Sequence, residues 1–284
     1  MKHALSRPSV AVGALLFAVG CVAVAAESLD WYASQHFVLG QASAVAQVGG
    51  FYGLVALGIG VAVAGAMLLG RGLAEASGGP PDSVWTVISE ALRSRADVRA
   101  GVVGGAIYGL LYLIISSMLV YQPSVDFAQY GITGPTVAAA TCCGPPGTVP
   151  ELIVYLVPQW HLALQILPLD ALFAVVIPIL VGFNLTVAAH ALRNKVLRSN
   201  VGWLGPVGLT AGFFTGCPTC AGLFLAGAVG GLGATSLAVA LAPYQLLFVA
   251  LSIPVLVASP LVVATYAGKA SAAACAVPQP ETVR

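Results

Sequence analysis

Six long apolar stretches constrain this chain more than any other feature of its sequence. Hydrophobic residues make up 59% of the chain and charged residues 7%, which is too few to cover a water-soluble domain. A helix needs about 20 mostly apolar residues to cross the hydrocarbon core of a bilayer. The sequence therefore predicts an all-α, polytopic membrane bundle in a single domain, residues 1–284. Its expected spans are residues 9–26, 48–70, 100–121, 166–191, 205–231 and 244–267.

The positions of the basic residues predict how these spans are oriented. All 11 Lys and Arg residues fall in the N-terminal segment, in alternate loops or in the C-terminal tail. Cytoplasmic segments of membrane proteins carry the excess of Lys and Arg. Both termini, the loop 71–99 and the tail 268–284 are therefore expected in the cytoplasm, and the loop 122–165 outside. The protein is expected to be a multi-pass protein of the plasma membrane.

The first apolar stretch allows a second interpretation. Lys2, His3 and Arg7 precede it and Ala-Ala-Glu ends it, a pattern that secretory signal peptides share. The apolar core of a signal peptide has about 7 to 15 residues, and this stretch is longer. We expect a retained span and keep a cleaved signal as the alternative.

An amphipathic pattern occupies residues 82–99, in the loop between the second and third spans. Trp85, Ile88 and Leu92 recur at helical spacing, with Arg93 beside them. A helix with one apolar face and a basic border suits the interface of a bilayer. The segment is predicted to be a short helix on the inner leaflet.

Four of the six cysteines occur as two close pairs. Cys142 and Cys143 are adjacent in the outer loop, whereas Cys217 and Cys220 flank Pro218 and Thr219 inside the fifth span. Proline is unfavourable inside a helix and favourable in its first turn. The fifth span is therefore expected to be broken near Pro218. Irregular backbone at that depth survives only where protein covers it or where it lines a cavity.

The outer loop is rich in Gly and Pro and is expected to fold back towards the bundle. Its residues 151–165 are apolar enough for an interfacial or re-entrant path. Such a fold would bring Cys142 and Cys143 towards Cys217 and Cys220, and four sulfurs bind a soft ion such as Cu, Zn or Hg. Because adjacent cysteines suit a shared ion, the favoured function is soft-metal binding or translocation.

Two other functions stay open. Cys217 and Cys220 have the spacing of a redox-active disulfide, so thiol-disulfide exchange with the outer pair is the second interpretation. In the third, the protein is a non-catalytic anchor subunit of a larger membrane complex, such as a respiratory one, and its cysteines are structural. The expected partners are the lipid bilayer and, in the third case, other membrane subunits. A net charge of +1 provides no basic surface for nucleic acid.

The cysteine pairs carry two partial resemblances. A Cys-x-x-Cys within a span, Cys217 to Cys220, combined with a cysteine pair in an outer loop resembles the membrane thiol oxidoreductases related to vitamin K epoxide reductase. The adjacent Cys142 and Cys143, followed by Gly and Pro, are similar to the ion-accepting pair of mercuric transport proteins. Each resemblance covers a few residues. Adjacent loop cysteines depart from the first family and six spans from the second, so neither family is assigned.

Three polar residues near the ends of spans are further candidates. Asp170 is the one carboxylate within a predicted span, where ionisable groups often have a function. Pro168 is expected to begin that helix, and an acid in a first turn is also favoured by the helix dipole alone. His161, beside Trp160, and His190 are considered as metal ligands, although histidines at helix ends are more often interfacial polar residues.

Polar groups in the middle of spans have a simpler explanation. Asn184 begins an Asn-Leu-Thr triplet, but a residue within a span is not accessible to glycosylation. Together with Thr186, Tyr108 and Tyr112, it is expected to form hydrogen bonds between helices.

Overall fold

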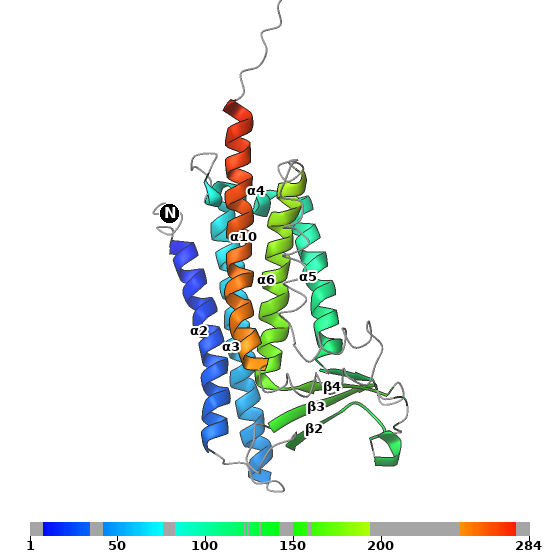
Figure 1. Cartoon of the computed structure of the whole chain (residues 1–284). Helices are drawn as coiled ribbons and strands as arrows, with labels where there is room; N and C mark the ends of the chain where they lie inside the picture. Colours follow the sequence, from blue (N-terminus) through cyan, green and yellow to red (C-terminus); the bar gives the residue numbers. More distant parts are fainter. Residues whose placement is uncertain are drawn as a thin grey trace, which may run out of the picture. The chain divides into compact units, whose positions relative to one another are not determined.

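The computed structural model is mostly helical in the residues that it describes (Figure 1). These are residues 8–34, 42–75, 83–116, 118–121, 123, 125, 127–130, 132–141, 150–157, 161–193 and 245–276. The helices are α2 (Pro8–Ser34), α3 (Ala42–Glu75), α4 (Val84–Arg93), α5 (Arg95–Ile115), α6 (Pro168–Arg193) and α10 (Gln245–Ala276). The helical character expected from the sequence is therefore confirmed.

Four of the described helices contain segments long and apolar enough to cross a membrane. These segments are Pro8–Ser28 in α2, Val48–Glu75 in α3, Arg95–Ile114 in α5 and Pro168–Arg193 in α6. They overlap the first four predicted spans. The sixth predicted span overlaps α10. The fifth predicted span, with its expected break near Pro218, lies outside the described residues.

Two compact units make up the chain. The first combines Met1–Ala11, Leu68–Tyr108 and Ile177–Arg284, and the second combines Val12–Met67 and Gly109–Val176. The helices α2, α3, α5 and α6 each contribute residues to both units.

In the first unit, α5 and α6 pack closely through glycines. A Cβ atom at Gly101 would lie 2.5 Å from the carbonyl oxygen of Gly182, and one at Gly105 would lie 2.8 Å from that of Pro178. Residues without a Cβ let membrane helices approach to this degree. As the residue numbers rise along α5, those of the α6 neighbours fall. The two helices are therefore antiparallel.

In the same unit, α10 runs parallel to α6. Nδ2 of Asn184 donates to the carbonyl oxygen of Leu256, 2.8 Å away. Further along both helices, α6 and α10 share a buried core with α4, formed by Val87, Ile88, Ala91, Val187, Ala191, Ala264 and Ala267. From the first contact to the second, the residue numbers rise in both helices. They therefore run in the same direction.

The predicted amphipathic helix is present as α4, but it is shorter than residues 82–99. Ile88 is 1% exposed, and Trp85 and Leu92 pack at the edge of the shared core, so one face is apolar as expected. Ser94 ends α4 and begins α5, because its side-chain oxygen accepts the backbone N–H of Asp97 (3.4 Å). The residues after Ser94 therefore belong to the next helix.

The chain between α5 and α6 adds a small sheet to the expected all-α bundle. It contains an antiparallel four-stranded sheet, β1 (Leu119–Tyr121), β2 (Thr136–Thr141), β3 (Pro150–Val157) and β4 (Leu162–Ile166), in the order β1-β4-β3-β2, and a short 3-10 helix, η1 (Phe127–Tyr130). Residues expected on an interfacial or re-entrant path form β3 and β4. Likewise, α5 ends at Ile115, before the predicted end of the span at residue 121. The β-branched and aromatic residues of β3 favour a strand.

The second unit joins this sheet to α3. The hydroxyl of Tyr52 donates to the carbonyl oxygen of Ile166, at the end of β4, over 2.7 Å. In the same unit, α2 packs on α3 through small residues, because Gly20 approaches the backbone of Gly58 and Ala62. Close backbone contacts therefore hold α2 on α3, and a side-chain hydrogen bond holds the end of β4 to α3.

Candidate functional site

The four residues of the predicted cysteine cluster, Cys142, Cys143, Cys217 and Cys220, lie outside the described residues. The chain on both sides of the first pair is described. Thr141 ends β2 and is paired in register with Pro150, the first residue of β3. The sheet thus holds the two ends of the connection that contains Cys142 and Cys143 next to each other.

Within the described ranges, no three His, Cys, Asp or Glu side chains gather as metal ligands. Cys21 of α2 is a free thiol there and is half-buried. The four cysteines of the predicted soft-metal site lie outside these ranges, so the site stays a prediction.

His161 holds the turn between β3 and β4. Its φ of 55° lies in the left-handed region, which residues other than glycine rarely adopt. Nδ1 lies 2.6 Å from the carbonyl oxygen of Val125, and because a carbonyl only accepts, Nδ1 carries the proton. The ring packs 6.2 Å from that of Phe127, which meets Tyr155 edge-on at 5.1 Å. These contacts give His161 a structural role, and a metal-ligand role stays a prediction.

Asp170 lies in the first turn of α6, and Pro168 begins that helix, as the sequence predicted. Asp170 is half-buried. The unpaired N–H groups of a first helical turn favour a negative charge. The position of Asp170 is therefore explained by the helix, and its functional role stays a prediction.

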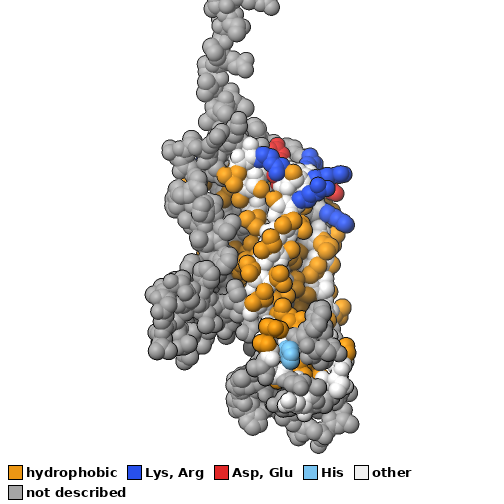
Figure 2. Space-filling view, turned by 90° about the vertical axis from the view of Figure 1, so that its right-hand side faces the viewer, with side chains coloured by type: hydrophobic (Ala, Val, Ile, Leu, Met, Phe, Trp, Pro, Cys, Tyr) orange, Lys and Arg blue, Asp and Glu red, His pale blue; other side chains and the backbone are white. Residues whose placement is uncertain are grey.

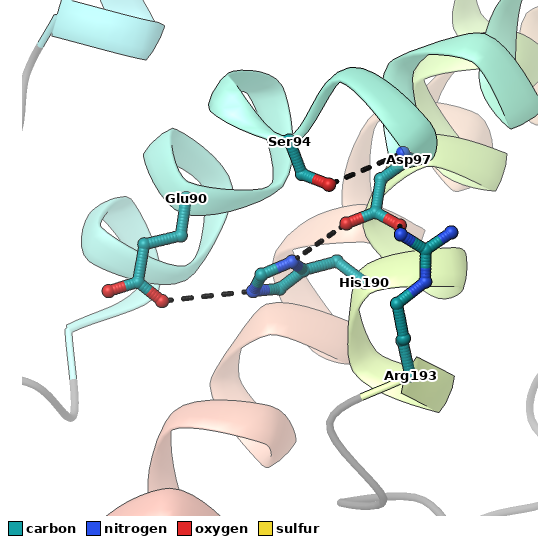
Figure 3. A network of polar contacts seen from close by, with 5 residues as sticks. All are labelled: Glu90, Ser94, Asp97, His190 and Arg193. Atoms are coloured by element: carbon teal, nitrogen blue, oxygen red, sulfur yellow. Dashed lines mark hydrogen bonds and ion pairs between the residues drawn. The ribbon is translucent and has the colours of Figure 1, made fainter.

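A polar cluster that the sequence analysis did not predict joins α4, α5 and α6 within the first unit. Figure 3 shows His190 between the carboxylates of Asp97 and Glu90. Nδ1 of His190 donates to Oδ2 of Asp97 over 3.0 Å, and Nε2 lies 3.7 Å from Oε2 of Glu90. Nη1 of Arg193 lies 3.1 Å from Oδ1 of Asp97. The cluster thus connects the amino end of α5 to the carboxyl end of α6.

Asp97 is the centre of this cluster because it is buried. It is 1% exposed, and a buried carboxylate is stable only when cations and donors compensate its charge. Its Oδ1 accepts no aligned hydrogen bond from the described residues, so the contact with Arg193 is an ion pair without that directional bond. His190 and Arg193, both from α6, therefore contact the two oxygens of this buried carboxylate.

Two local sequence signals of this cluster were present but were not used in the prediction. Asp97 follows Ser94 by three residues, the spacing of a capping box. His190 and Arg193 are three residues apart and so share a face of α6. The predicted third span began at residue 100, which left Asp97 in a loop and separated it from α6.

The described surface is that of a protein in lipid. Large apolar side chains are exposed on several helices, including Leu15 (63%), Leu57 (64%) and Val102 (65%). Figure 2 shows such side chains over a wide surface, with Lys and Arg gathered beside it. Together with four helices of spanning length, they identify the solvent as a bilayer. The chain is a membrane protein.

Comparisons of this membrane protein with protein-family models, with curated proteins and with solved structures find no match.

Proposed function

We propose that this membrane protein binds or translocates a soft metal ion through Cys142, Cys143, Cys217 and Cys220, on the extracytoplasmic side. The observation that carries the proposal is the sequence spacing: one pair is adjacent, and the other is Cys-x-x-Cys beside a proline. Thiolates are the ligands that soft ions such as Cu(I) prefer, and Zn accepts them too. The paired strand ends at Thr141 and Pro150 add support, because a rigid base limits the freedom that two ligands lose on binding.

Thiol-disulfide exchange is the second candidate, and the spacing of Cys217 and Cys220 favours it. Two cysteines separated by two residues close a disulfide whose reduction potential the surrounding protein can tune. In a third case, a non-catalytic anchor subunit, the same cysteines bind no metal and undergo no reversible oxidation.

Metal analysis of the purified protein tests these functions. We expect about one Cu or Zn ion for each chain, because four thiolates complete a tetrahedral site. Cys217→Ser and Cys142→Ser should each lose the metal. Cys21→Ala is the matched control, because Cys21 is a half-buried thiol of α2, and it should keep the metal.

Thiol titration separates the remaining outcomes. A metal-free protein that reversibly gains two thiols on reduction, and loses this change in Cys217→Ser, supports exchange. A protein with neither metal nor reversible thiols contradicts both functions and supports the anchor subunit.

Six spans with cytoplasmic termini are part of the proposal. Because α10 runs parallel to α6, a chain that leaves α6 on one side of the membrane must cross it again before α10 begins. The apolar stretch 205–231 is long enough for this crossing. The parallel helices therefore support the predicted fifth span.

The distribution of charge supports the orientation. The residue ranges of the second unit contain no Lys or Arg, and all 11 belong to the first. In the first unit, Asp97 of α5 and Arg193 of α6 meet at one pair of helix ends. By the positive-inside rule, these ends face the cytoplasm. The segment that follows α5, with the sheet, is then extracytoplasmic.

A further inference from the structure

The outward face of α5 changes from basic to apolar within one helical turn. Arg95 and Arg99 are both exposed, and residues four apart lie on the same face of a helix. Val102 and Val103 continue this face and are 65% and 58% exposed. The step from Arg99 to Val102 is about 4.5 Å along the axis. We name Arg95, Arg99, Val102 and Val103, all in the first unit, the α5 outer face.

The opposite side of α5 is already occupied. Asp97 faces His190 and Arg193, and Gly101 and Gly105 contact the backbone of α6. The α5 outer face therefore points away from α6. Since its apolar part is exposed, lipid is the solvent there.

The two acids nearest to these arginines in sequence are engaged by other groups. Asp97 is buried in the polar cluster, and Glu90 lies 3.7 Å from His190. Two cations at a spacing of four residues repel each other, and cations in the first turns of a helix oppose its dipole. An anion bound between Arg95 and Arg99 offsets both effects.

We propose that the α5 outer face binds an anionic phospholipid, with Arg95 and Arg99 on the phosphate and Val102 and Val103 along an acyl chain. A guanidinium group matches the geometry of a phosphate with two parallel hydrogen bonds. The apolar continuation selects a lipid over free phosphate, because only a lipid has a chain to lie on it. Figure 2 shows the Lys and Arg side chains next to a hydrophobic surface, the arrangement that such a ligand needs.

The experiment measures lipid retention by the full-length protein. Protein in detergent is mixed with equal amounts of phosphatidylglycerol and phosphatidylcholine, and native mass spectrometry counts the bound lipids. In the double variant Arg95→Gln, Arg99→Gln, we expect the preference for phosphatidylglycerol to fall by about tenfold. The matched control is Arg71→Gln, Lys269→Gln, which removes two exposed cations from α3 and α10. It should change the preference by less than about twofold.

Further arms decide between the explanations. Equal losses in the test and control variants would show a general charge effect and overturn the proposal, as would no loss in either. Displacement of phosphatidylglycerol by millimolar inorganic phosphate would show a free-phosphate site and also overturn it. The variant Arg95→Lys, Arg99→Lys should keep part of the preference for phosphatidylglycerol. Lysine keeps the positive charge but cannot form the two parallel hydrogen bonds of a guanidinium group. Circular dichroism of each variant checks that a loss does not come from unfolding.

Discussion

Pro260 has no backbone N–H, so it leaves the carbonyl oxygen of Leu256 without its helical partner in α10. Asn184 of α6 supplies the missing donor, with Nδ2 2.8 Å from that oxygen. The same nitrogen donates to the carbonyl oxygen of Leu180 (2.8 Å), and Oδ1 accepts the hydroxyl of Ser259. The side chain thus compensates a proline in the neighbouring helix, which explains why an amide is kept inside an apolar span.

Replacing Asn184 with Leu should therefore destabilise the protein by about 1 kcal/mol, the scale of a hydrogen bond between membrane helices. In a Pro260→Ala background the cost should be smaller, because alanine returns a backbone N–H to the Leu256 carbonyl. Unfolding in mixed micelles with increasing sodium dodecyl sulfate, followed by circular dichroism, measures both costs. Equal costs in the two backgrounds would show that Asn184 does not act through the proline.

Asp97 and Glu90 both contact His190, but burial separates their contributions. Asp97 is 1% exposed, whereas the side chain of Glu90 is 58% exposed and its contact is 3.7 Å long. Asp97→Asn should cost about 2 kcal/mol, below the usual cost of breaking a buried pair because Arg193 itself is half in solvent. Glu90→Gln should cost less than about 0.5 kcal/mol. The same unfolding titration compares them, and a larger effect at Glu90 would contradict the central role of Asp97.

At the residue scale, the sequence predicted roles that depend on local geometry. Pro168 begins α6 and Asn184 hydrogen-bonds between helices, both as expected. Thr186 was also expected to bond between helices, but its hydroxyl donates to the Gly182 carbonyl of its own helix (2.9 Å). The Asp97 cluster depends on residues 93 positions apart in sequence, and only the packing of α5 on α6 brings them together.

Among the elements, the pair α2 and α3 shows how backbone proximity limits substitution. A Cβ atom at Gly20 would lie 2.5 Å from both the backbone nitrogen of Ala62 and the carbonyl oxygen of Gly58, whereas nothing lies within 4 Å of one at Gly60. Gly20→Ala should cost about 1 to 3 kcal/mol, because backbone atoms cannot move aside. Gly60→Ala should be neutral or stabilise by up to about 1 kcal/mol. Thermal unfolding in detergent checks both, and equal effects would mean that the helices are not packed at Gly20.

Helices were easier to predict than strands for a physical reason. A spanning helix satisfies its own backbone hydrogen bonds, so its length and apolar composition are visible in one stretch of sequence. The strands depend on distant partners, as the pairing of Leu119 with Leu164 shows. Apolar runs of strand length, such as β3, are ambiguous by periodicity alone. The break at Ser94 was missed because the prediction treats residues 82–99 as one helix, although the apolar positions that define its face end at Leu92.

For the whole molecule, the sequence predicted the class of protein and a consistent topology, while its cysteine cluster stays a prediction. The segregation of Lys and Arg to one side involves the whole chain, so it holds even where the predicted end of a single span is wrong by a few residues. A thiolate site depends on where a loop and a broken span meet, and no local pattern encodes that meeting. The parallel direction of α10 and α6 adds a constraint that the sequence lacked, namely that the chain crosses the membrane between these two helices.

That constraint predicts which side of the membrane each segment faces. Three single cysteines are introduced into a chain whose native cysteines are replaced: Gln129→Cys in η1, Arg95→Cys in α5 and Lys269→Cys in α10, all at exposed positions. Between positions 129 and 269 the proposed chain crosses the membrane three times, and between 95 and 129 once. A membrane-impermeant maleimide should therefore label position 129 in intact cells, and positions 95 and 269 only after permeabilisation. If position 269 labels together with 129 while 95 stays protected, residues 194–244 do not cross the membrane. That result would contradict six spans, because α6 and α10 cannot both cross the membrane in the same direction without a crossing between them.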